Sequence, residues 1–277
     1  MKKYTAILLL LLSTTLTLAQ KKDKIKGSKT VTIEQKEVGD FEALEVEDNL
    51  EVHLERGEKT ELKIEADDNL HDIISFDLRD KILRIYTTKE AVNYKKIIVR
   101  VTYTKDLNLI TSKNESTINA IQEIQLDNLT FKAHDYSALF LNVNAKNFIL
   151  QTDDKSKTEL NLKSENAIME LSKNSSLKAL VSTIDLKVDM YQKSNATIEG
   201  DATNAILRLD NNSNLTGNKL ILKNADVTTE SYSNCNLNVT TAVIIDATNK
   251  SEIQLLGTPK IEIRKFADEA KLIKKLK

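Results

Sequence analysis

The stretch Phe148–Ile198, FILQTDDKSKTELNLKSENAIMELSKNSSLKALVSTIDLKVDMYQKSNATI, decides how this chain folds. It contains Ser156, Ser175 and Ser194 at intervals of 19 residues, and each serine lies in a polar cluster. Apolar and polar residues alternate on both sides of each cluster, which is typical of strands with one buried face. The stretch therefore predicts short strands that are joined by polar turns at a fixed interval.

The same pattern extends in both directions, with intervals of 18 to 21 residues between the serines Ser116, Ser137, Ser156, Ser175, Ser194, Ser213, Ser233 and Ser251. Two residues after each serine comes a mostly apolar position: Ile118, Leu139, Thr158, Leu177, Ala196, Leu215, Cys235 and Ile253. Six residues before it comes another: Ile110, Phe131, Leu150, Met169, Val188, Leu207, Val227 and Ile245. A repeat of this length has no room for a crossover helix and predicts one coil of a β-solenoid.

We therefore expect an all-β fold in which residues 111–264 form a parallel β-solenoid, or β-helix, of about eight coils. Equivalent residues would stack at roughly 4.8 Å from coil to coil. A sandwich of stacked antiparallel hairpins is the alternative. Asn-Gly or Asp-Gly turns would mark such hairpins, and neither dipeptide occurs in the chain.

The remaining segments lie on either side of the repeat. Residues 31–110 contain alternating strands of uneven length and a short helical turn capped near Asp67, which predicts a β-rich N-terminal cap. At the other end, residues 265–277 form a Lys-rich segment with apolar residues about one helical turn apart. This segment is expected to be either a short amphipathic cap or a tail.

The N-terminus has the features of an export signal. Two lysines precede an apolar run that ends in small residues, so residues 1–19 are predicted to be a signal peptide, followed by a polar leader over 20–30. The run is too short for a typical membrane span, and no later run has spanning length. We expect an exported protein, periplasmic or at the cell surface, without a transmembrane anchor after cleavage.

Composition excludes several classes of function. A net charge of −1 argues against nucleic-acid binding, and a single cysteine excludes an internal disulfide. Cys235 falls at an inward position and is expected to be structural, while His53, His71 and His134 are expected at the surface. The pairs Asp67–Asp68 and Asp153–Asp154 fit a cap and a turn. No cofactor or metal site is predicted.

An outward position seven residues before the serines suggests a contact surface. It reads Thr130, Ile149, Ile168, Lys187, Ile206, Asp226 and Ile244, and Glu262 continues the series in a last partial coil. Adjacent coils do not carry paired acids here, so the column does not predict a glycosidase. Ile149, Ile168, Ile206 and Ile244 instead form a candidate strip for contact with a partner or a second copy. The alternative is that the coil bends at this point and covers these residues.

Three segments of residues 31–110 carry a resemblance to a known family: Val38–Val46, Leu50–Gly57 and Ile64–Leu70. With the Ser/Asn-punctuated coils, the chain resembles exported bacterial proteins described as putative auto-transporter adhesin, head GIN domain. The resemblance implies an exported, solenoid-like head domain, and it brings no catalytic residues with it.

The expected function is therefore that of an exported, non-enzymatic binding or structural protein of the cell envelope, adhesin-like in character. Its partner would be an unknown protein or glycan, and self-association is a further expectation. Two alternatives stay open. One is a carbohydrate-active β-helix enzyme, and the other is an envelope signalling accessory that binds another protein through the acidic N-terminal region.

Overall fold

The computed structural model describes residues 22–275, so the signal peptide predicted for residues 1–19 lies outside the described residues. The strands are β1 (Lys24–Lys26), β2 (Val31–Glu37), β3 (Ala43–Val46), β4 (Glu51–Arg56), β5 (Glu61–Asp67), β6 (Ile74–Arg79), β7 (Ile82–Thr87), β8 (Glu90–Val92), β9 (Ile97–Tyr103), β10 (Leu109–Ser112), β11 (Thr117–Ala133), β12 (Ala138–Thr152), β13 (Lys157–Leu171), β14 (Ser176–Met190), β15 (Asn195–Leu209), β16 (Asn214–Thr229), β17 (Asn234–Ala247), β18 (Glu252–Leu256), β19 (Lys260–Phe266) and β20 (Lys271–Lys274). One 3₁₀ helix, η1 (Asp68–Ile73), lies between β5 and β6.

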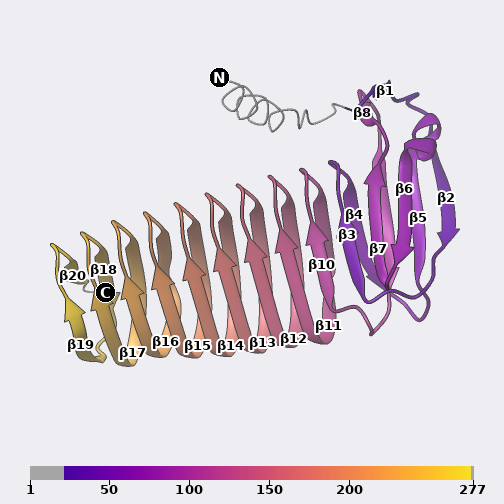
Figure 1. Cartoon of the computed structure of the whole chain (residues 1–277). Coiled ribbons are helices and arrows are strands. Elements are labelled where there is room, and N and C mark those ends of the chain that lie inside the picture. The colour runs from indigo at the N-terminus through magenta and orange to yellow at the C-terminus, as the bar shows by residue number, and fades with distance from the viewer. Residues whose placement is uncertain (1–21, 276–277) are drawn as a thin grey trace, which may run out of the picture.

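The repeat folds as a parallel β-solenoid of about nine turns with coils of about 19 residues, which confirms the predicted fold class. Each of β11 to β17 runs down one face of the rod, bends, and returns up the other face (Figure 1). Each strand pairs in parallel with its equivalent in the next coil, as Leu139 does with Thr158 and Thr158 does with Leu177. The serine spacing therefore sets the register of the whole rod.

Tight turns at the serine positions join one coil to the next. The first is Lys113–Ser116, in which the Ser116 N–H donates to the Lys113 carbonyl at 3.1 Å. Its two central residues, Asn114 and Glu115, both have positive φ, as a type I′ turn requires. Equivalent pairs recur down to Asp268 and Glu269 without a single glycine.

The ridge formed by these turns is held together between coils as well as within them. The Tyr136 N–H donates to the Asp154 carbonyl at 2.9 Å, and the Lys155 N–H donates to the Lys173 carbonyl at 3.1 Å. The flanking strands pair with neighbouring coils rather than with each other. Turns that usually make hairpins therefore link two faces of the rod here.

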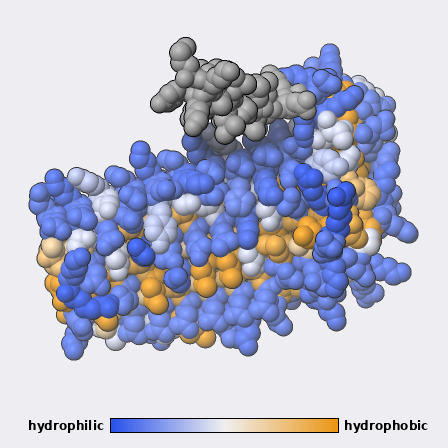
Figure 2. Space-filling model, viewed as in Figure 1, coloured by the Kyte–Doolittle hydropathy of each residue, from blue (hydrophilic) through white to orange (hydrophobic). Residues whose placement is uncertain are grey.

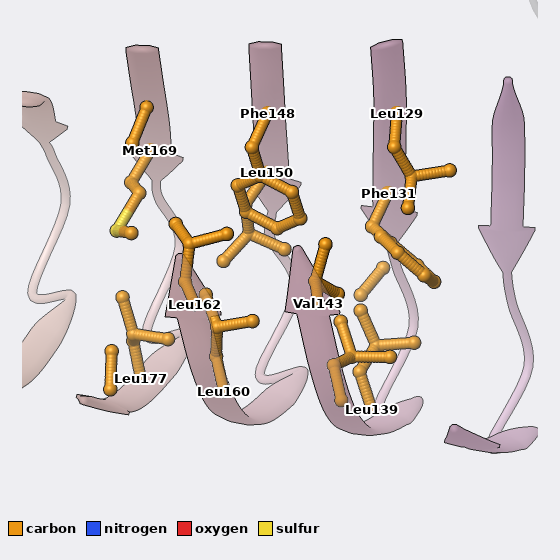
Figure 3. Close-up of a cluster of buried hydrophobic side chains, with 14 of the residues drawn as sticks. Leu129, Phe131, Leu139, Val143, Phe148, Leu150, Leu160, Leu162, Met169 and Leu177 are labelled. Atoms are coloured by element: carbon orange, nitrogen blue, oxygen red, sulfur yellow. The ribbon is translucent and has the colours of Figure 1, made fainter. Parts of the chain in front are cut away.

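The core of the rod is built from the inward columns. Figure 3 shows side chains from the two faces meeting in the interior, with Phe148 and Leu150 directed toward Leu160 and Leu162. The rings of Phe131 and Phe148 lie 6.2 Å apart and tilted. The position two residues after each serine forms one buried column, as the repeat predicts: Leu139, Thr158, Leu177, Ala196, Leu215, Cys235 and Ile253.

The N-terminal region joins the rod out of chain order. Strand β4 pairs in parallel with both β9 and β11, and β3 pairs in parallel with both β7 and β10. Residues 43–56 thus lie between segments that follow them in sequence. Parallel stacking begins well before residue 111, the start that we expected for the solenoid.

Antiparallel strands and η1 close this end of the rod. Strand β2 pairs antiparallel with β5, β5 with β9, and β6 with β7. The helical turn expected near Asp67 is present as η1, but the Asp67 side chain does not cap it. The carboxylate instead accepts the backbone N–H groups of Lys29, Lys95 and Lys96, which lie in other segments.

The C-terminal segment continues the solenoid. Strand β19 pairs in parallel with β17, and β20 pairs in parallel with β18. The turn between β19 and β20 contains Asp268 and Glu269, which both have positive φ as in the turns of the earlier coils. The helical spacing noted over residues 265–277 is therefore misleading for 265–274. Strand pairing with the previous coil determines the structure of those residues.

Candidate functional site

The outward column that contains the four candidate isoleucines is continuous in the structure. We call it the outer column, and its members pair in register from coil to coil: Thr130, Ile149, Ile168, Lys187, Ile206, Asp226, Ile244 and Glu262. Its side chains alternate with buried neighbours on each strand, so they face away from the core. Ile206 is 57% exposed, while Ile149, Ile168 and Ile244 are half-buried.

A ladder of five asparagines and one aspartate, which we call the amide ladder, runs along one side of the outer column, two residues earlier in each coil. It consists of Asn128, Asn147, Asn166, Asp185, Asn204 and Asn224. The Asn147 Nδ2 donates to Asn128 Oδ1 at 2.8 Å, and Asn166 Nδ2 donates to Asn147 Oδ1 at 2.9 Å. These bonds fix the orientation of the amides and leave a polar border beside the isoleucines.

A mostly charged border lies on the other side of the outer column, two residues later in each coil, and we call it the charged border: Lys132, Gln151, Glu170, Asp189, Arg208, Thr228, Asp246 and Arg264. Two residues of this border, Asp189 and Arg264, form ion pairs with the two central charges of the outer column. Lys187 lies 2.8 Å from Asp189, and hydrogen bonding to that carboxylate raises the pKa of Lys187. Asp226 pairs with Arg264, and this hydrogen bond likewise raises the pKa of the guanidinium.

The face is thus a parallel sheet on which a column of isoleucines, interrupted by Lys187 and Asp226, runs between polar borders. Figure 2, viewed as in Figure 1, shows a broken orange band along the rod on the side where the arrowheads of β11 to β17 lie. Side chains in such a line stand at roughly the strand spacing of 4.8 Å. An exposed apolar strip rimmed by polar groups is the kind of surface that contacts another macromolecule.

The outer column extends further toward the N-terminal end than the repeat indicates. Leu109 pairs with Thr130 on one side and with Ala43 on the other, and Ala43 pairs with Ile82. Ile82 is 43% exposed, and Leu109 is half-buried. The sequence carries no signal for Ile82, because its strand lies outside the repeat and joins the column only through out-of-order pairing.

The other chemically notable residues are mostly structural. Cys235 is buried in an inward column, and desolvation raises the pKa of its thiol, so it is not a reactive nucleophile. Asp153 occupies a turn, where it binds the His134 Nδ1 at 2.7 Å and Lys173 at 3.5 Å. Among residues 22–275, His, Cys, Asp and Glu do not gather into a group of three that could hold a metal.

The prediction that His71 lies at the surface is wrong. Its side chain is buried in η1 with 8% exposure, and its Nε2 lies 2.9 Å from Thr32 Oγ1 on β2. The residue joins the end helix to the edge strand. His71 lies within the 3₁₀ helix η1, on the side that packs against the core. The sequence alone does not show which side of so short a helix is buried.

An open groove lies on the opposite sheet, with a volume of about 640 Å³. Phe140 and Leu180 form part of its lining, and Glu159 and Glu199 lie along it. Both carboxylates are in ion pairs, Glu159 with Lys178 at 4.0 Å and Glu199 with Lys219 at 3.0 Å.

These features define a class of protein: a parallel β-solenoid whose outer sheet carries a single-file column of isoleucines interrupted by charged residues. The chain belongs to the family described as putative auto-transporter adhesin, head GIN domain. The family model matches residues 40–180 and 157–259. The resemblance noted in the sequence is thereby confirmed.

Solved structures share the fold over nearly the whole chain. A putative adhesin from Parabacteroides merdae superposes with a TM-score of 0.71 and 15% identity, covering 92% of this chain and all of the other. A putative lipid binding protein from Parabacteroides distasonis gives a TM-score of 0.65 and 11% identity, with 92% and 100% coverage. A putative adhesin from Parabacteroides distasonis gives 0.59 and 17%, with 90% and 99% coverage. None of the curated proteins matches the chain. No helix within residues 22–275 has both the length and the apolar character needed to cross a bilayer.

Proposed function

We propose that this protein is an exported, non-enzymatic binding protein of the cell envelope, adhesin-like in character, that contacts its partner through the sheet bearing the outer column. The partner would be a protein or glycan in the periplasm or at the cell surface. The observation that carries the proposal is that Ile149, Ile168, Ile206 and Ile244 share one outward column of a regular sheet, with Lys187 and Asp226 between them.

Two further points support this function. The family description names adhesion rather than a reaction, and solved structures of the same fold include proteins named as putative adhesins. A solenoid also suits a contact role, since its stacked coils present a long surface of fixed geometry.

The location is tested by protease treatment of intact cells that produce the protein. Digestion of the chain in intact cells would support surface exposure. Protection in intact cells with cleavage after lysis would place it in the periplasm and count against adhesion to other cells. Recovery of the chain with cytosolic proteins would contradict export.

The contact face is tested by sedimentation of the purified chain with an envelope fraction from the cells that produce it. Ile206→Asp should reduce the bound fraction by about tenfold, because it replaces the most exposed isoleucine of the outer column with a charge. Ile184→Asp is the matched control, since Ile184 is 51% exposed and lies off the outer column. Equal binding by both variants and wild type would contradict the proposed face.

A carbohydrate-active enzyme is the second candidate, favoured by the groove that holds Glu159 and Glu199. Paired carboxylates in a groove are the arrangement used to cleave glycosidic bonds. Release of reducing ends from envelope polysaccharide, abolished by Glu159→Gln and by Glu199→Gln, would establish this function. Wild-type protein that releases none would reject it.

A further inference from the structure

We infer that the outer column binds a second copy of this chain face to face, with the two rods antiparallel and a two-fold axis passing at Ile206. The inference rests on the proposed function in one respect, that the sheet bearing the outer column is the contact surface. It names one partner for that surface, which the order of residues along the column identifies.

The outer column is complementary to itself about Ile206, because aliphatic residues match on the two sides and the charges are opposite. Lys187 precedes Ile206 by one coil, and Asp226 follows it by one coil. Two coils away lie Ile168 on one side and Ile244 on the other. The order around the centre is therefore aliphatic, positive, aliphatic, negative, aliphatic.

Two symmetric arrangements can bring this face against its copy. A two-fold axis along the rods places each residue opposite its own equivalent, so that Lys187 meets Lys187 of the partner subunit and Asp226 meets Asp226 of the partner subunit. Like charges in contact are unfavourable, and more so as water is excluded. The charges of the column therefore disfavour parallel rods.

A two-fold axis across the rods at Ile206 gives the opposite result. Lys187 then faces Asp226 of the partner subunit, Ile168 faces Ile244 of the partner subunit, and Ile206 faces its own copy. This is an isologous contact, in which one patch is complementary to itself. Ile206, 57% exposed in the single chain, becomes the buried centre.

The ion pairs within each chain strengthen this arrangement. Lys187 is held by Asp189 at 2.8 Å, and Asp226 is held by Arg264. Across the contact, the Asp189–Lys187 pair would meet the Asp226–Arg264 pair of the partner subunit. Four charges of alternating sign would then form a row on each side of the axis, which retains partners for both central charges after they leave water.

The amide border of the column fits a sheet-on-sheet contact. The amide ladder faces its own copy, and Asp185 comes opposite Asn224 of the partner subunit, an acceptor opposite a donor. Packed sheets lie about 10 Å apart and cross at roughly 30°, so the central coils make the closest contact. Arg208, two residues after Ile206 on the central coil, comes opposite its own copy, so its long side chain must extend away from the axis to keep the two guanidinium groups apart in water.

The first test measures mass by sedimentation equilibrium on the purified chain without its signal peptide. The expected result is a dimer that weakens by at least about tenfold in Ile206→Asp and is unchanged in Ile184→Asp. A wild-type chain that stays monomeric up to millimolar concentration would overturn the inference. So would a dimer that tolerates Ile206→Asp.

The second test uses charge exchange between two variants. Lys187→Asp and Asp226→Lys should each be monomeric, since each places like charges across the antiparallel contact. Mixed together they should form a heterodimer, because Asp226 and the new aspartate of one chain then meet lysines of the other. Circular dichroism of each variant checks that the rod is folded. Failure of the mixture to associate would reject the antiparallel arrangement.

The outcomes separate this inference from the proposed function. A monomeric chain whose sedimentation with the envelope fraction depends on Ile206 would retain the binding function and reject the second copy as the partner. A wild-type dimer that binds the envelope fraction no better than Ile206→Asp would retain the second copy as the partner of this face. It would reject this face as the contact with the envelope fraction.

Discussion

At the scale of single residues, Thr158 is a polar residue at an inward position where the other coils carry an apolar side chain. It lies between Leu139 and Leu177 in an inward column, and its Oγ1 is buried without a hydrogen-bond partner in the described part of the chain. A buried hydroxyl without a partner keeps its desolvation penalty. Thr158→Val should therefore raise the free energy of unfolding by about 1 kcal/mol. Urea unfolding measures this, with the exposed Thr216→Val as a control of little effect; a destabilised Thr158→Val variant would show that the hydroxyl does find a partner.

The turn residues carry a second effect at this scale. Lys193 has a φ of 63° in the turn Tyr191–Ser194, and its N–H donates to the Asn211 carbonyl at 2.9 Å. A side chain at such an angle costs about 1 kcal/mol, which glycine avoids while keeping the N–H. Lys193→Gly should raise the midpoint of thermal unfolding. Lys178→Gly, in extended backbone on β14, should lower the midpoint of thermal unfolding. If both variants shift the midpoint in the same direction, φ does not govern the effect.

At the scale of elements, Asp67 at the end of β5 binds the two segments that follow β1 and β8, through backbone N–H groups of Lys29, Lys95 and Lys96. Burial works to raise the pKa of this carboxyl, but three backbone N–H groups outweigh it and hold the pKa below its ordinary value of 3.8. The close approach also requires Gly27, since a Cβ there would clash with Asp67 Oδ2 and would lie 2.7 Å from the Tyr94 Cα. The contact is therefore specific to a charged carboxylate beside a glycine.

The lowered pKa gives the contact a definite pH dependence. A group with a depressed pKa stabilises the fold above its unfolded pKa, and this stabilisation is lost as pH falls through the folded value. Hydrogen exchange at the Lys95 and Lys96 amides should be slow near neutral pH and become fast, after correction for intrinsic rates, below about pH 4. Asp67→Asn should expose these amides at neutral pH, whereas exposed Asp72→Asn should not. Equal protection in Asp67→Asn would contradict the role of the charge.

The sequence predicts elements well where a repeat exists and poorly elsewhere. The columns through Leu139 and Ile245 follow from the serine spacing, because period-two alternation fixes which side chains point inward. The same periodicity gives the positions of Ile149 and Ile206 in the candidate site. It does not give Ile82, whose place depends on β3 stacking between β7 and β10, a long-range pairing with no local signal. Nor does it reveal the burial of His71, which depends on how η1 packs across the end.

At the scale of the whole molecule, the two ends of the rod differ. The N-terminal end is closed by η1 and by β2, which places Glu34 opposite Ile64 and Lys36 opposite Leu62. Inward charges on an edge strand discourage further strand pairing. The C-terminal end has no such cover within residues 22–275. Ile261, Ile263 and Phe266 continue the inward columns and are 40%, 51% and 42% exposed.

This asymmetry predicts a large difference between equivalent residues of adjacent coils. Ile245 and Ile263 pair in one inward column, yet Ile245 is fully buried while Ile263 is half exposed. Ile245→Ala should lower the free energy of unfolding by about 2–5 kcal/mol, because it leaves a cavity between coils on both sides. Ile263→Ala should cost less than about 1 kcal/mol, since water already reaches that side chain. Chemical denaturation of the two variants measures the difference, and equal losses would show that the last coil is covered in solution, by another part of the chain or by another molecule.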